Sequence, residues 1–119
     1  MIKTSLYPVN NHQQYHAHVY FDAETLEYAK DLCLRVGKIF DLPVGRLHEK
    51  PVGPHPKWSC QISFTSQDFE QLVPWLDRER KNLTVLIHGV TGDDIADHTK
   101  HVYWLGGAVK LNLSIFGIE

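Results

Sequence analysis

The chain has 119 residues, 43% of them hydrophobic and 22% charged, which is ordinary for one compact domain, so we expect a single domain over residues 1–119. Its formal net charge of −2 gives no electrostatic reason to expect nucleic acid or an anionic membrane as a partner. A membrane helix needs about 20 apolar residues, and no apolar run in the sequence approaches that length. No signal-peptide segment is visible either, so we expect a cytoplasmic protein.

The first predicted strand, residues 15–21, carries two histidines on one face. Aromatic and β-branched residues dominate it, and Asp22 closes it. Successive side chains of a strand point to opposite faces. One face is therefore apolar and consists of Ala17, Val19 and Phe21. The other face, which suits water, a metal or a substrate, consists of His16, His18 and Tyr20.

A helix and two further strands follow. Apolar residues at three- and four-residue spacing between Leu26 and Phe40 predict an amphipathic helix that Pro43 ends. Residues 44–49 predict a short strand with Arg46 and His48 facing away from the core. A loop rich in proline, residues 50–57, leads to a strand over residues 58–64 that alternates apolar and polar side chains.

The second half of the chain repeats this pattern. Thr65 and Asp68 form a capping-box signal for a second helix. Residues 83–88 predict a strand that ends in His88, and a loop rich in glycine and aspartate follows it. Residues 109–115 alternate once more and predict an additional strand near the C-terminus.

The order of these elements predicts an α+β fold, a ferredoxin-like βαββαβ sandwich with an extra C-terminal strand. In that topology both helices cover one face of an antiparallel sheet, and the first and third strands are central. The opposite face stays open unless a partner, a tail or a ligand covers it. The strand phases predict that this open face carries His16, His18, Tyr20, Arg46, His48, Ser59, Gln61, Ser63, Thr84 and His88.

Three of these histidines are predicted to converge. The first and fourth predicted strands are antiparallel neighbours, so His88 should approach His16 and His18. Three imidazoles in this arrangement can bind a divalent metal such as Fe(II) or Zn(II). His55 and His98 lie in loops that can fold over the rim of the open face. No carboxylate belongs to the open-face set, so a triad of two histidines and one carboxylate is not indicated.

Several segments resemble the DOPA 4,5-dioxygenase family. They are YHAHVYF at 15–21, HEKPVGPHP at 48–56, His88, TGD at 91–93, DH at 97–98 and WLG at 104–106. The match runs in order through most of the chain. The resemblance implies a ferredoxin-like fold and extradiol cleavage of a catechol ring by a non-haem iron protein. The family's motif histidines match His16, His18, His48, His55, His88 and His98.

Strand phases and resemblance together predict roles for individual residues. The expected ligands of Fe(II) are His16, His18 and His88, with His55 as the first replacement and Zn(II) or another divalent ion as a possible occupant. Acid–base work, in which a catechol proton is taken or a leaving oxygen protonated, is expected of His48, His55 or His98. Arg46 can pair with a substrate carboxylate, and Tyr20 and Gln61 can line the pocket.

Two other readings remain open at this point. One is a metal- or small-molecule-binding module without catalytic activity. The other is a metal-free dimeric α+β enzyme in which the open faces of two subunits pack together. The tail strand can extend a sheet or reach a second subunit, so we expect a homodimer.

Overall fold

The computed structural model describes residues 7–117. Its strands are β1 (Gln14–Phe21), β2 (Trp58–Thr65), β3 (Val85–Gly89) and β4 (Val102–Leu105). Its helices are α1 (Leu26–Phe40), α2 (Ser66–Glu79), the short α3 (Asp94–Asp97) and a 3₁₀ turn, η1 (Leu113–Phe116). Within the described part of the chain, none of these helices has the length and apolarity needed to cross a membrane.

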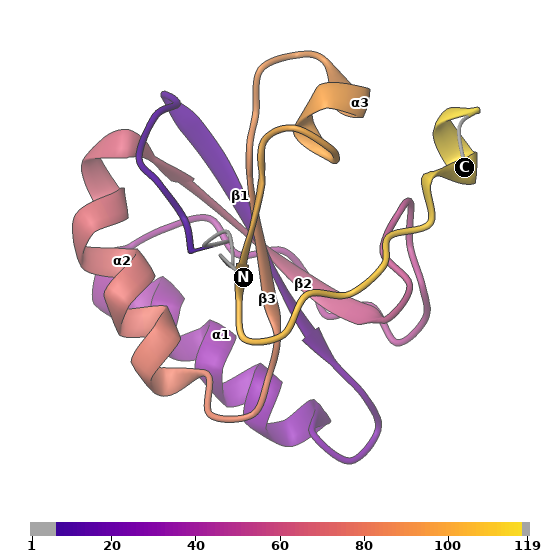
Figure 1. The fold of residues 1–119 in the computed structure, drawn as a ribbon. Coiled ribbons are helices and arrows are strands. Elements are labelled where there is room, and N and C mark those ends of the chain that lie inside the picture. Colours follow the sequence, from indigo (N-terminus) through magenta and orange to yellow (C-terminus); the bar gives the residue numbers. More distant parts are fainter. Residues whose placement is uncertain (1–6, 118–119) are drawn as a thin grey trace, which may run out of the picture.

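The four strands form one antiparallel sheet in the order β2-β1-β3-β4. α1 and α2 lie side by side against one face of it (Figure 1). The predicted apolar phases are confirmed, because alternate residues of β1, β2 and β3 meet the buried sides of both helices in one hydrophobic core. The capping box of Thr65 and Asp68 is also present at the start of α2. The α+β, ferredoxin-like fold class is confirmed.

The prediction of a strand at residues 44–49 is wrong. Only isolated bridges join this segment to β2, Val44 with Ile62 and His48 with Ser59. Gly45 donates its backbone N–H to the carbonyl of Gln61, but between the two bridges this segment advances four residues while β2 advances three. The register therefore changes and a continuous ladder does not form. As a result β2 lies at the edge of the four-stranded sheet. The central strands are β1 and β3 rather than the first and third strands in the predicted order.

The extra C-terminal strand exists but lies earlier than predicted. It is β4, at residues 102–105, whereas residues 109–115 form an extended segment that ends in η1. Val109 and Leu111 of that segment pack against a small second core on the face opposite the helices, made of Tyr20, Leu86 and Trp104. The alternation of apolar and polar residues that predicts a strand here arises because one side of this segment packs on the sheet.

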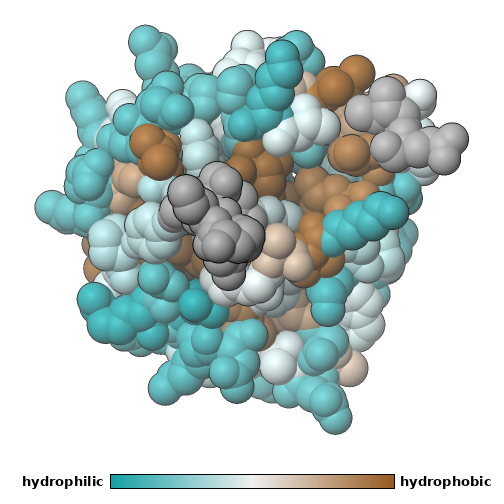
Figure 2. Space-filling model, viewed as in Figure 1, coloured by the Kyte–Doolittle hydropathy of each residue, from teal (hydrophilic) through white to brown (hydrophobic). Residues whose placement is uncertain are grey.

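The C-terminal segment covers part of the face that the sequence predicts to be open. It crosses the molecule on the side away from α1 and α2 (Figure 1). In the same view, hydrophilic residues dominate over the two helices, and hydrophobic residues gather to the right of centre (Figure 2). The backbone N–H of Asn112 donates to the carbonyl of Pro54 at 2.8 Å, which ties this segment to the proline-rich loop.

Candidate metal centre

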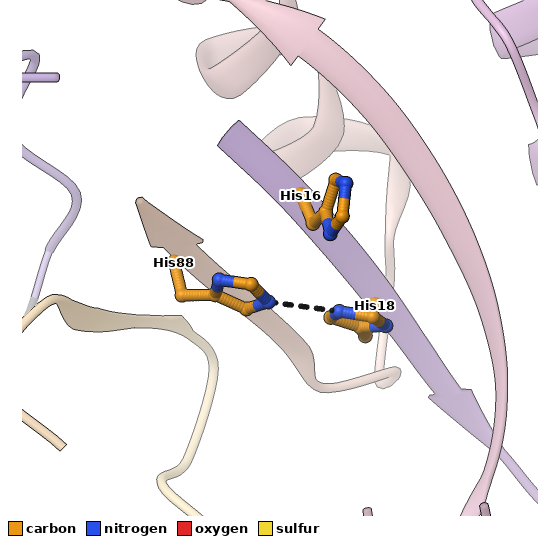
Figure 3. A group of neighbouring side chains, drawn as sticks. All are labelled: His16, His18 and His88. Atoms are coloured by element: carbon orange, nitrogen blue, oxygen red, sulfur yellow. Dashed lines mark hydrogen bonds between the residues drawn. The ribbon is translucent and has the colours of Figure 1, made fainter. Parts of the chain in front are cut away.

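Three histidines from two neighbouring strands lie together on the sheet face opposite α1 and α2. Antiparallel pairing places His16 of β1 directly opposite His88 of β3, and His18 follows on the same face of β1. One ring nitrogen from each of the three lies within 4.8 Å of the others. The three rings point into a common space (Figure 3). The predicted convergence is confirmed, and the cluster can hold a metal ion.

The closest pair of ring nitrogens has the separation that a shared ion would impose. Nε2 of His18 lies 3.1 Å from Nε2 of His88. Two nitrogens bound at about 2.0–2.1 Å to one ion stand roughly 2.9 Å apart at a right angle and roughly 3.4 Å apart at a tetrahedral angle. The observed separation falls between these values. A bound ion would therefore require little movement of these two side chains.

A backbone carbonyl fixes the orientation of His88. Its Nδ1 lies 2.8 Å from the carbonyl oxygen of Gly89, which can only accept a hydrogen bond. The proton of neutral His88 is therefore on Nδ1, and the lone pair of Nε2 points toward His18. A ligating histidine commonly donates its second ring N–H to a carbonyl in this way.

The cluster forms the floor of a pocket of about 300 Å³, a volume that suits a small ligand. Six histidines line it. Three come from β1 and β3, two from the segment before β2, and one directly follows α3. They are His16, His18, His48, His55, His88 and His98. All six are the histidines that the family resemblance singles out. The rings of His55 and His98 lie 4.0 Å from His18 and 4.4 Å from His88 respectively, measured between centroids.

Tyr20 holds His55 from outside the pocket. Its hydroxyl lies 2.8 Å from Nδ1 of His55, and both side chains are buried. Burial raises the pKa of Tyr20, so the hydroxyl keeps its proton. No other acceptor lies within reach of that hydroxyl among the described residues, so it donates to Nδ1. The proton of neutral His55 is then on Nε2, and the imidazole offers a donor toward the pocket.

His98 has the opposite polarity. Its Nδ1 lies 2.8 Å from the carbonyl oxygen of Asp94, one turn earlier in the chain, and therefore donates to it. Nε2 of neutral His98 is left with a lone pair and can accept a proton. The ring of Phe116, from the C-terminal segment, packs at 5.4 Å from the ring of His98 and limits its movement.

The remaining predicted site residues are divided between the pocket and the surface. Gln61 lines the pocket, with its amide nitrogen 3.4 Å from Nε2 of His16. His48 also lines it, held by paired backbone hydrogen bonds to Ser59. Arg46 is exposed and is not among the lining residues. Tyr20 is not among them either, since His55 stands in front of its hydroxyl.

Two carboxylates reach the pocket, although the strand phases place none on this face. Asp94 and Asp97 both line it, from α3. Asp97 is buried and accepts hydrogen bonds from the backbone N–H and the hydroxyl of Thr91 at 2.9 and 2.7 Å, so it closes the loop before α3. Strand periodicity contains no information about a loop that folds over the sheet. Asp97 beside His98 in the TGD…DH segment was the only sequence signal.

Burial keeps the imidazoles of His18, His55 and His88 uncharged. Desolvation is the main cause that lowers the pKa of His55 and of His88 to about 4 and that holds the pKa of His18 well below its usual value. Repulsion from neighbouring histidines acts in the same direction. Neutral imidazoles are the form that binds metal ions, so no proton has to be removed from these rings at neutral pH.

These shifts predict that acid destabilises the metal-free protein. His88 has a pKa near 6.5 when unfolded and about 4 when folded, so between these values the unfolded chain binds more protons. The stabilisation is complete above pH 6.5 and is lost as the pH falls through this range, by at most about 3 kcal/mol for this residue. Urea denaturation from pH 7 to 4 measures it. His88→Gln should show a smaller decline, and equal declines in both proteins would contradict the assignment.

Comparisons with known proteins agree with this geometry. The sequence model described as "Dopa 4,5-dioxygenase family" matches residues 15–115. A crystal structure of a protein from Nostoc punctiforme, described as a "putative dioxygenase", superimposes with a TM-score of 0.84 at 40% identity, over 88% of this chain and 91% of that one. The resemblance read from the motifs is confirmed.

Two curated fungal relatives are longer than this chain. A protein of Amanita muscaria named "DOPA 4,5-dioxygenase" is 29% identical over an alignment of 116 residues that covers 90% of this chain and 51% of the relative. An uncharacterised 21.2 kDa protein of Botryotinia fuckeliana is 32% identical over an alignment of 110 residues that covers 82% of this chain and 60% of the relative. The chain thus spans only 51–60% of the length of these relatives.

Proposed function

The chain belongs to the Dopa 4,5-dioxygenase family, and from this premise we propose that it is an extradiol ring-cleaving dioxygenase. Its substrate is a catechol, its co-substrate is dioxygen, and its cofactor is Fe(II) held by histidines. The observation that carries the proposal is the group of three imidazoles on the floor of a small pocket, whose ring nitrogens lie close enough together to bind one ion.

The residues present fit such an ion. The proposed ligands are His16, His18 and His88, all neutral nitrogen donors. Three protein ligands leave further coordination positions open, which a thiolate cage generally would not. Bound iron would supply the site at which catechol oxygens and dioxygen are brought together. Zn(II) or another divalent ion suits the same donors and can occupy them after purification.

Two of the remaining histidines can contact substrate oxygens, one as a proton acceptor and one as a hydrogen-bond donor. We assign to Nε2 of His98 the role of accepting a catechol proton, because its Nδ1 proton is committed to the carbonyl of Asp94. We assign to His55 the role of hydrogen-bond donor to an oxygen of the substrate, because Tyr20 keeps the proton of the neutral ring on Nε2. His48, at the pocket wall, is the alternative for either step.

The other predicted substrate contacts differ in whether they reach the pocket. The proposed contact of Gln61 with the substrate rests on its place in the lining beside His16. Tyr20 contributes through His55, and a contact between Arg46 and a substrate carboxylate would require its side chain to reach in from the surface. The homodimer and the cytoplasmic location stay predictions.

The test is anaerobic loading with Fe(II), followed by dioxygen uptake and detection of a yellow ring-opened product with a small panel of catechols. We expect uptake and product together with at least one catechol. Stoichiometric iron without either signal would reject the dioxygenase and favour the non-catalytic binding module. Turnover of a substrate by the metal-free protein would instead favour the metal-free enzyme.

The Tyr20–His55 hydrogen bond gives a prediction about turnover. Tyr20→Phe removes only the hydroxyl, so His55 loses the contact that fixes its proton on Nε2. We expect the rate of dioxygen uptake at saturating catechol to fall about tenfold with the iron content unchanged, as for other groups that orient a functional histidine. Tyr103→Phe is the matched control, because the Tyr103 hydroxyl bonds Asn11 at 3.1 Å and does not touch the pocket. Equal rates in both variants would contradict this role of Tyr20.

A further inference from the structure

The lining of the pocket has an uneven distribution of charge. Among the described residues that line it, two are aspartates, Asp94 and Asp97, and none is a lysine or an arginine. Arg46, the cation that the sequence predicts as a substrate contact, is exposed and is not part of the lining. Apart from a metal on its floor, the pocket thus offers no fixed positive partner for an anionic group.

The two aspartates differ in what they can still bind. Both oxygens of Asp97 accept hydrogen bonds from Thr91, and the side chain is 3% exposed. Asp94 uses its backbone carbonyl for His98, while its carboxylate has no hydrogen bond or ion pair within the part of the chain that the structure describes. Asp94 is also one of the exposed lining residues, so it stands at the mouth.

The metal-binding histidines and Asp94 therefore lie at opposite depths of the pocket. His18 and His88 are 5% and 3% exposed and form its floor. A catechol that binds through its hydroxyl oxygens must direct those oxygens to the floor. A substituent on the far side of its ring then points toward the exposed part of the lining, to which Asp94 belongs.

We propose that this site selects catechols whose ring substituent is neutral or cationic and discriminates against an anionic substituent, with Asp94 as the specificity-determining residue. The proposal rests on the proposed dioxygenase function and names its substrate class. A protonated amine on a short side chain pairs with Asp94, whereas a carboxylate meets a like charge and finds no cation in the lining. A substrate carrying both groups lies between these cases.

The experiment is an anaerobic binding titration of the zinc-loaded protein, followed by tryptophan fluorescence, so the result does not depend on turnover. The probes share one catechol ring and differ in charge: dopamine is cationic, 4-methylcatechol neutral and 3,4-dihydroxyphenylacetate anionic. We expect dopamine to bind about tenfold more tightly than the anion, with the neutral catechol between them, since a partly exposed charge pair contributes modestly. Asp94→Asn should reduce this ratio to about threefold or less.

Glu49→Gln is the matched control, because it removes one negative charge from an exposed residue next to His48 that does not line the pocket. It should keep the tenfold ratio. Equal or tighter binding of the anion, or an unchanged ratio in Asp94→Asn, would overturn the proposal even if every catechol is cleaved by the iron-loaded protein. If no catechol binds and none is cleaved, the dioxygenase assignment fails and this inference fails with it.

Discussion

Replacing His18 by alanine is expected to abolish stoichiometric metal binding. Nε2 of His18 stands 3.1 Å from Nε2 of His88, and the pairing of β1 with β3 fixes the backbone positions of the other two histidines of the cluster. Loss of a partner that only orients a ligand costs about 10–100-fold in affinity, so loss of a ligand itself should cost more than about 100-fold. Equilibrium titration with Zn(II) and with anaerobic Fe(II) measures it.

The control for this variant must separate lost ligation from lost folding. His88→Ala should show the same loss, whereas His101→Ala, outside the pocket lining, should bind one ion per chain as the wild type does. Circular dichroism should report the same fold in all three variants. Unchanged metal content in both His18→Ala and His88→Ala would reject the ligand assignment.

Replacing His55 by glutamine is expected to remove catalysis without removing the metal. Its Nε2–H is held toward the pocket by the 2.8 Å hydrogen bond between Nδ1 and Tyr20, and the proline-rich loop restrains its backbone. Removing one positioned hydrogen-bond donor from a group that develops charge typically costs about 10²–10³-fold in rate. The measurement is single-turnover dioxygen uptake with saturating catechol, at iron contents matched to the wild type.

This prediction also separates two roles for the same residue. If His55 is a ligand rather than a hydrogen-bond donor, His55→Gln loses iron in the titration before any turnover is measured. Full iron content with a wild-type rate would show that neither role applies. His98→Gln provides the comparison, because its Nε2 has the opposite polarity and its loss should slow removal of the catechol proton.

Strand periodicity predicted the floor of the site because side chains along β1 and β3 alternate between the two faces of the sheet, which leaves each histidine only one face to occupy. Once the apolar side chains of β1 face the helices, His16 and His18 must face the other way. Antiparallel pairing then brings the end of β3 beside the start of β1, where His88 lies opposite His16. These residues follow from two rules, alternation and pairing, that act within the sheet.

The rest of the site depends on loops, to which those rules do not apply. Asp94 lines the pocket because α3 lies over the sheet, and no residue spacing in the sequence indicates that path of the chain. The C-terminal segment was also mispredicted for this reason. Its apolar and polar residues do alternate, but the apolar residues Val109 and Leu111 pack on Tyr20 and Trp104 without forming a strand. Tyr20, predicted to line the pocket, bonds His55 because the proline-rich loop lies between it and the pocket.

The central claim is that imidazoles from β1 and β3 hold one ion, and anomalous diffraction from a crystal of the zinc-loaded protein tests it most directly. We predict a single strong peak at about 2.0–2.1 Å from one ring nitrogen of each of His16, His18 and His88, with Nδ1 of His88 still bonded to Gly89. A peak bound by other residues, or none near these three rings at full zinc loading, would contradict it.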